Sequence, residues 1–349
     1  MTSHRQLAAA SLASPFTQSG VPKVYDEVRE PDRQATAELL KTWQASFFPC
    51  SSENDARDHQ YLDVGCGPGN FTLKYLLSLC PPTLKRLVAS DNSEAMLDYA
   101  RMVHAHPKID HRLLDIAVDD DVTRFIAEEG RFERVYSFLA FHWIQNRGAA
   151  LKNIERLMTS GGECLVIYNP YPAPALLYRA LLESKSWAKY HDVIWRAMPV
   201  FHEHSDAVSL RKNLFDLVKL TALIPLTCEL VGVNVKSASI DDAVCTQLAP
   251  PYISCSQKKR NPSCSSSSKI SCCKDIAPAS QQKEQQNSSD LFFTATNRRL
   301  HFCLHQCIEN RQSDVTAQTS HSQTSQILVK VSFTKYRRNA EIRACKERD

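Results

Sequence analysis

The sequence predicts an α/β fold built on a doubly wound, mostly parallel sheet. Between residues 60 and 168, short apolar segments alternate with amphipathic segments, as expected for parallel strands connected by helices. A glycine-rich turn follows the first apolar segment, where an open sheet of this kind places its ligand. The 349 residues, of which 43% are hydrophobic, are enough to bury a core.

The predicted elements follow one another in a regular order. We expect strands at residues 60–65, 85–90, 109–114, 133–138 and 163–168. Helices are expected at residues 71–79, 93–105, 120–129 and 146–158, with Ser93 placed to cap the second. Right-handed crossovers would join these units into one sheet.

The segments on either side of this core have different characters. Residues 31–47 are expected to form an amphipathic helix with Pro31 in its first turn. Residues 170–204 are rich in aromatic residues and proline and interrupt the alternation, which indicates a lid or an insertion that lines the substrate site. A helix at residues 206–220 and a strand at residues 224–235 follow.

Composition divides the chain into three parts. We expect a flexible N-terminus (1–22), one domain (23–249) and a largely disordered tail (250–349) with low-complexity sequence. The tail carries a net charge of +8, whereas residues 1–249 carry −4. Residues 327–336 alternate like a strand. Either they add a seventh strand to the sheet, since loop closure costs little more for a long loop, or the sheet edge stays unpaired.

Several classes of protein fit this sequence poorly. No apolar run reaches the ~18 residues of a membrane span, and the N-terminus lacks a convincing secretory signal. The cysteines do not form a disulfide pattern, so a reduced, cytoplasmic location is expected. Tail cysteines and histidines lack zinc-site spacing, and the basic tail clusters are typical of solvated chain. We therefore expect no metal and no nucleic-acid partner, in a monomer or a homodimer.

The glycine-rich turn DVGCGPG spans residues 63–69. Glycine occupies every second position from residue 65 to residue 69, so Cβ atoms are missing where the backbone must approach a ligand closely. The G-x-G-x-G spacing differs from the G-x-G-x-x-G of dinucleotide folds and favours S-adenosylmethionine, although glycines alone also occur in simple tight turns. The expected cofactor contacts here are Asp63, Gly65, Cys66, Gly67 and Gly69.

Two further acids follow the next two strands. Asp91 is suited to accept hydrogen bonds from both ribose hydroxyls, and Asp115 from the adenine amino group, with Ile116 against the ring. A lone aspartate at a strand end is more often a cap, but acids after three successive strands favour the cofactor site. The remaining expected contacts are Asn92, Met96 and Phe138.

The segment SFLAFHWIQ, residues 137–145, follows the fourth strand and is expected to line the methyl-acceptor face. Together with LDVGCGPGN, LVASDNSEAM, LLDI, A-x-x-N-I and GGECLVIY, it resembles the insect juvenile hormone acid methyltransferases and their arthropod relatives over residues 24–245. The resemblance implies the seven-stranded, Rossmann-like class I methyltransferase fold. It also implies esterification of farnesoic or juvenile hormone acids with S-adenosylmethionine, so a lipophilic small-molecule acid is the expected partner.

The resemblance also implies catalytic residues. In the family a glutamine and a tryptophan hold the acid, and they correspond to Gln34 and Trp143 here. The family pattern Y-x-x-x-N-x-x-Q is altered, because two extra residues lie between Tyr25 and Gln34 and Arg29 stands where asparagine is expected. His142 is the third candidate, either as a hydrogen-bond partner of the acid or as a structural imidazole.

The chemistry of the acceptor leaves three alternatives. A carboxylic acid is already ionised at neutral pH, so a carboxyl methyltransferase needs no general base. A hydroxyl or amine acceptor would need one, and His142 is the first candidate. A catalytically silent binding protein is the third interpretation. Aromatic residues from the insertion are expected either to enclose an apolar substrate or to form ordinary core: Tyr168, Tyr171, Tyr178, Trp187, Tyr190, Trp195 and Phe201.

Overall fold

The computed structural model describes residues 21–44, 60–170, 206–237 and 322–335, with scattered positions between 178 and 200. The described strands form one seven-stranded sheet in the order β3-β2-β1-β4-β5-β7-β6. β1 to β5 are parallel, and β7 is antiparallel to both of its neighbours. The strands are β1 (Gln60–Val64), β2 (Arg86–Asp91), β3 (Ile109–Leu113), β4 (Phe132–Phe138), β5 (Met158–Tyr168), β6 (Leu223–Ser237) and β7 (Ser322–Lys335). The predicted doubly wound α/β fold is confirmed.

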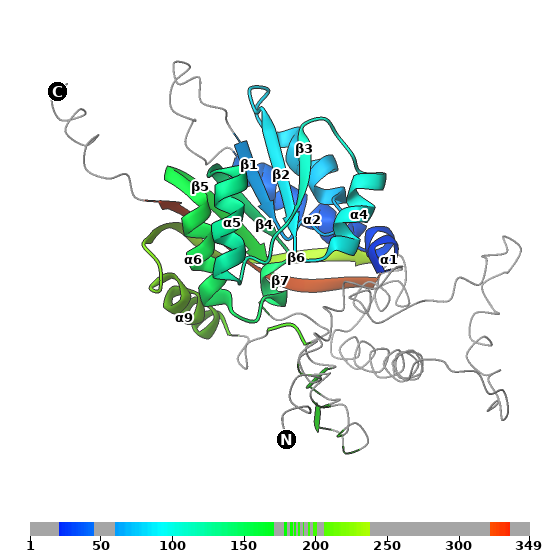
Figure 1. Ribbon diagram of the computed structural model, residues 1–349. Helices are drawn as coiled ribbons and strands as arrows, with labels where there is room; N and C mark the ends of the chain where they lie inside the picture. Colours follow the sequence, from blue (N-terminus) through cyan, green and yellow to red (C-terminus); the bar gives the residue numbers. More distant parts are fainter. Residues whose placement is uncertain are drawn as a thin grey trace, which may run out of the picture.

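Helices cover both faces of the sheet (Figure 1). Buried residues of α5, α6 and α9 pack on one face, and those of α2, η3 and α4 pack on the other. The bounds are α1 (Val21–Val28), α2 (Glu30–Gln44), the π-helix η3 (Thr72–Leu76), α3 (Leu77–Leu79), α4 (Glu94–Val103), α5 (Asp119–Glu129), the 3-10 helix η4 (Phe141–Trp143), α6 (Arg147–Leu157) and α9 (Ala207–Val218). Among the helices described, none combines the length and the apolar character needed to cross a membrane.

The N-terminal part differs from the sequence-based expectation. One helix was expected at residues 31–47, but two helices, α1 and α2, meet at Arg29. α1 begins at Val21, inside the segment that was expected to be flexible. Asp26 explains how α1 is held, because its carboxylate lies 2.9 Å from His104 Nε2 at the end of α4 and 3.3 Å from the Tyr99 hydroxyl. These contacts are distant in sequence, so local patterns do not reveal them.

Residues 327–335 of the strand expected at 327–336 lie in β7, which inserts between β5 and β6. Val331 and Phe333 point into the core shared with α5, α6 and α9. On the opposite face, Lys330 is fully buried, with its ammonium group over the ring of Trp43 on α2 and 3.5 Å from Glu229 on β6. β7 therefore supplies core residues to both faces of the sheet. The placement of residues 238–321 lies outside the described residues, so the expected domain boundaries stay predictions.

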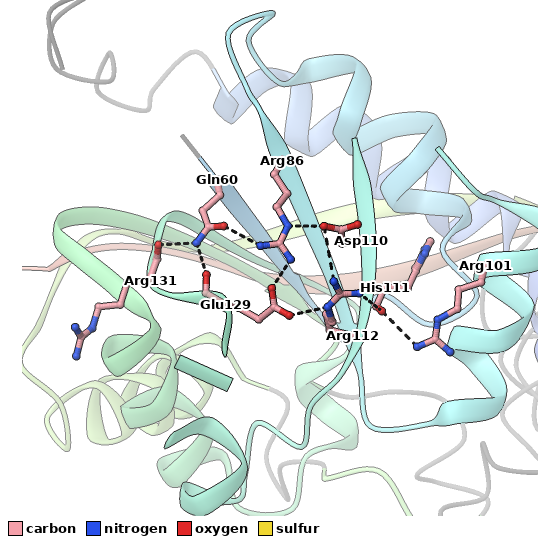
Figure 2. Close-up of polar contacts among 8 residues, drawn as sticks. All are labelled: Gln60, Arg86, Arg101, Asp110, His111, Arg112, Glu129 and Arg131. Carbon is pink, nitrogen blue, oxygen red and sulfur yellow. Dashed lines mark hydrogen bonds and ion pairs between the residues drawn. The ribbon is translucent and has the colours of Figure 1, made fainter. Parts of the chain in front are cut away.

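A polar network closes the amino ends of β1, β2 and β3, opposite the glycine loop (Figure 2). Arg86 bonds Asp110 at 2.5 Å and also pairs with Glu129, and Arg112 Nε donates to Glu129 at 2.6 Å. Gln60 donates to the carbonyl of Glu129 at 2.7 Å. Burial works to raise the pKa of Glu129, but the two arginines outweigh burial and lower it. The network fixes α5 to the sheet edge and is separate from the ligand edge.

Replacing Phe333 by alanine tests whether β7 belongs to the core. Phe333 is 1% exposed, so the cavity left behind should lower the free energy of unfolding by about 3–5 kcal/mol in urea denaturation. Phe215→Ala on α9, where the ring is 43% exposed, is the matched control and should cost much less. Equal losses for the two variants would contradict the placement of β7.

Candidate active site

A cavity of about 470 Å³ lies at the carboxyl edge of the sheet. Residues after β1, β2, β3, β4 and β5 line it, and α1 and α2 close another side. The sheet order reverses direction between β1 and β4, and this is the switch point at which open α/β sheets bind ligands. The volume is in the usual range for small-molecule sites.

The three glycines of the loop after β1 have different structural roles. Gly65, Gly67 and Gly69 all have positive φ, at 77°, 56° and 83°. A Cβ at Gly65 would lie 2.3 Å from Ala140 Cβ, and one at Gly69 would lie 2.9 Å from Ala100 Cβ, so these two glycines permit close packing. A Cβ at Gly67 would meet nothing within 4 Å. Gly67 therefore leaves open space where the loop borders the cavity.

Asp91 ends β2 and ties it to the glycine loop. Its Oδ2 accepts the Gly67 N–H at 2.9 Å, and its Oδ1 accepts the Ser93 N–H at 2.9 Å. Burial raises the pKa of Asp91 to about 6, against the opposing effect of these N–H donors. A carboxylate has about four acceptor sites, so Asp91 keeps acceptor capacity for a ligand hydroxyl beyond its backbone donors. Ser93 also caps α4 through Met96 N at 3.3 Å, which confirms the predicted cap.

Asp115 follows β3 and lines the cavity beside Ile116. Its Oδ1 accepts the Ala117 N–H at 2.9 Å, which fixes the carboxylate in a tight turn. Asn153 on α6 donates to the Ile116 carbonyl at 3.0 Å and so stabilises the same turn. Asp91 and Asp115 therefore share one cavity with Gly67, as the sequence predicts.

Asp63 and Gly69 were expected to contact the cofactor, but neither lines the cavity. Asp63 is 2% exposed and accepts a hydrogen bond from Thr72 Oγ1 at 2.6 Å. Burial raises its pKa to about 7, and the nearby charge of Asp91 adds to the increase. In the structure Asp63 ties β1 to the start of η3, so it supports the loop from behind.

The segment after β4 forms the opposite wall. Leu139 has φ of 54°, an unusual and strained value for leucine that is typical of functional sites. Its N–H donates to the Ile167 carbonyl at 2.7 Å, which fixes the turn to β5. The following η4 helix carries His142 and Trp143, and both line the cavity.

His142 is buried, and its Nδ1 has no hydrogen-bond partner in the described structure. Burial lowers its pKa to about 3, and the positive charges of Arg29 and Arg147 lower it further. The imidazole is therefore neutral at physiological pH. A group with so low a pKa is a poor acceptor for the proton of an alcohol.

Gln34 lies outside the cavity, so the structure does not bring it to Trp143. The Gln34 side chain is exposed on α2, with its amide 3.5 Å from Glu30 Oε1. The N-terminal side chains that do line the cavity are Tyr25, Arg29, Asp32 and Arg33. Arg29 stands at the break between α1 and α2, whereas Gln34 lies on the other side of α2. The two extra residues before Gln34 and the arginine at a family asparagine position were the sequence signals for this difference.

The aromatic residues of the expected insertion do not form a described cavity wall. Tyr168 is buried, and its ring centre lies 5.7 Å from that of Phe141. Tyr178 is buried, whereas Trp195 is 58% exposed. Tyr171, Trp187, Tyr190 and Phe201 lie outside the described residues. The described apolar lining comes from Phe71 before η3, from Phe138, Leu139 and Ile144 at and after the end of β4, and from Met198 of the expected insertion.

Most predicted cofactor contacts meet in this cavity. The lining residues among them are Gly65, Cys66, Gly67, Asp91, Asn92, Met96, Asp115, Ile116 and Phe138. The site suits a nucleoside, since Asp91 offers two acceptor oxygens and Ile116 and Met96 offer apolar surface. The open space at Gly67 leaves room for a chain attached to that nucleoside.

Residues 62–166 match a family model described as "Methyltransferase domain". The chain is 29% identical over 157 residues to juvenile hormone acid O-methyltransferase of Bombyx mori, covering 45% of this chain and 55% of that protein. The chain is 32% identical over 171 residues to the juvenile hormone acid O-methyltransferase of Drosophila melanogaster, covering 48% of this chain and 54% of that protein. It is 33% identical over 135 residues to malonyl-[acyl-carrier protein] O-methyltransferase of Legionella pneumophila, covering 39% of this chain and 44% of that protein.

The chain thus spans about half the length of the curated relatives that it matches. The matched family segment runs from β1 to β5 and contains the glycine loop, Asp91, Asp115 and Trp143. With the sheet order found here, residues 62–166 are a methyltransferase domain of the class I fold, and that domain resembles the juvenile hormone acid methyltransferases.

Proposed function

We propose that the protein transfers a methyl group from S-adenosylmethionine to the carboxylate of a lipophilic acid. The observation that carries this proposal is that a nucleoside-type site at Asp91 and Gly67 shares one cavity with Trp143 and with His142, whose pKa burial lowers to about 3. The similarity to juvenile hormone acid O-methyltransferases supports an acid such as farnesoic acid.

The cofactor would lie along the carboxyl ends of β1, β2 and β3. Asp91 would accept the ribose hydroxyls, Asp115 would accept the adenine amino group, and Gly67 would border the amino-acid end. When bound, S-adenosylmethionine supplies a methyl group on positively charged sulfur. The residues of this chain then have to orient the acceptor oxygen toward that methyl group and exclude water.

A carboxylic acid suits this wall because it arrives ionised. Its pKa lies near 4–5, so at neutral pH the attacking oxygen carries a lone pair and no proton has to be removed. The neutral His142 is consistent with this chemistry, whereas a hydroxyl acceptor would require a base. The indole N–H of Trp143 is a donor that can orient the acid group. Gln34 has no part in this proposal, since it lies outside the cavity.

The apolar lining accounts for the lipophilic part of the substrate. Phe138, Leu139, Ile144 and Met198 present hydrocarbon on the acceptor side. Holding the acid in line with the methyl group in such an enclosure can lower the barrier by about 7–11 kcal/mol. Orientation is therefore sufficient to explain catalysis without an acid or a base.

Asp91→Asn should weaken binding of S-adenosylhomocysteine roughly 10- to 100-fold in calorimetry, because hydrogen bonds to a charged group contribute about 1.5–3 kcal/mol. For the wild type, affinity should fall as the pH drops through about 6, where Asp91 becomes protonated and loses acceptor capacity. The pH dependence should flatten in Asp91→Asn. Asp120→Asn, at an exposed position of α5, is the control. Unchanged affinity in Asp91→Asn would contradict this cofactor site.

A labelled-methyl assay with farnesoic acid, farnesol and a long-chain amine tests the acceptor. We expect transfer to the acid only, with a loss of roughly 10-fold or more in kcat/KM for Trp143→Phe. Trp195→Phe, at a 58% exposed ring, should retain full activity. His142→Ala should cost less than about 10-fold and leave the pH profile unchanged. Transfer to farnesol that depends on His142 would reject the carboxylate assignment.

A further inference from the structure

Arg29 brings a positive charge to the cavity. It occupies the junction between α1 and α2, lines the cavity, and its side chain is 13% exposed. Its guanidinium carbon lies 5.4 Å from the centre of the Tyr25 ring, so the ring supports one face of the group. Arg29 is therefore a positioned group inside the site and not a solvated surface charge.

The hydrogen-bond donors of Arg29 are only partly used. Its Nη1 donates to Asp32 Oδ2 at 2.8 Å, whereas its Nε is buried and has no partner in the described structure. A buried N–H of a charged group without an acceptor is costly. The Arg29 guanidinium therefore has donor capacity that no described protein group uses.

Arg33 provides an internal comparison. It also lines the cavity, but its Nε donates to Glu30 at 3.0 Å and its Nη2 bonds the Asp26 carbonyl. Its donors thus hold α1 and α2 together. Arg29 differs because its Nε has no hydrogen-bond partner among the described residues.

Arg29 acts on the acceptor wall of the cavity. Arg29 and His142 line the same cavity, and the charge of Arg29 contributes to the low pKa of His142, after burial. The cofactor acids Asp91 and Asp115 follow β2 and β3 on the other side of β1. The cavity therefore has acidic groups where the nucleoside is expected and a cation toward His142.

We propose that Arg29 binds the carboxylate of the methyl acceptor and selects acids over neutral analogues, an inference that rests on the proposed function. Guanidinium and carboxylate match in shape and charge, which gives strong and directional recognition. Asp32 neutralises part of the guanidinium charge. The acid is thus held in place while its second oxygen keeps the electron density needed to attack the methyl group.

The test measures binding of farnesoic acid and its primary amide to protein saturated with S-adenosylhomocysteine, by calorimetry. Wild type should bind the acid at least roughly 10-fold more tightly than the amide. Arg29→Gln should abolish this preference, and Arg29→Lys should restore part of it. Affinity for S-adenosylhomocysteine alone should change less than about 2-fold. Lys23→Gln, an exposed charge on α1, is the matched control and should behave as wild type.

Three results would overturn the inference. A larger loss for S-adenosylhomocysteine than for the acid would assign Arg29 to the carboxylate of the cofactor. An unchanged preference in Arg29→Gln, or no preference in the wild type, would leave Arg29 as a structural residue only. If Arg29→Gln fails to fold, Arg29→Gln with Asp32→Asn removes both charges and provides the same comparison. Acid binding without methyl transfer would reject the proposed function but support Arg29.

Discussion

The close approach of Gly65 to Ala140 is the constraint on which the geometry of the cavity depends. The loops after β1 and β4 meet at the reversal of the sheet, and a side chain at Gly65 would place its Cβ 2.3 Å from Ala140 Cβ. Ala140, which contacts Gly65, lies between Leu139, which has a positive φ, and the η4 helix. The nucleoside-type site and the acceptor wall therefore face each other across one junction, which requires glycine at position 65.

Charge is distributed across that junction in a way that suits the proposed chemistry. Asp91, Asp115 and the ion pair of Arg29 with Asp32 line one cavity, together with the neutral His142. A sulfonium cofactor is favoured near the acids and an acidic substrate near the guanidinium. Methyl transfer between them neutralises both charges, so an enclosed apolar site favours the products. Asp32 offsets part of the positive charge of Arg29, which limits how tightly the acid is held before reaction.

Local patterns revealed the sheet, the loop and the acids, because each depends on residues close together in the sequence. The glycine spacing and the strand-end positions of Asp91 and Asp115 were sufficient to place them in one cavity. Spacing alone could not show that the Asp63 side chain faces η3, where Thr72 Oγ1 donates a hydrogen bond to it. Gln34 and Arg29 depend on how two N-terminal helices pack, and that packing rests on the distant pair Asp26 and His104.

β7 shows why a long separation in sequence does not prevent a complete sheet. Residues 238–321 separate β6 from β7. Treated as a plain loop, closing such a length costs only about 3 kcal/mol more than a short hairpin, because the cost grows with the logarithm of length. Burying Phe333 and Val331 can offset that amount. β7 pairs with β5 from Glu163 to Tyr168, and the Ile167 carbonyl holds Leu139 in its strained turn. β7, the last of the described strands, therefore supports the segment after β4 although none of its residues lines the cavity.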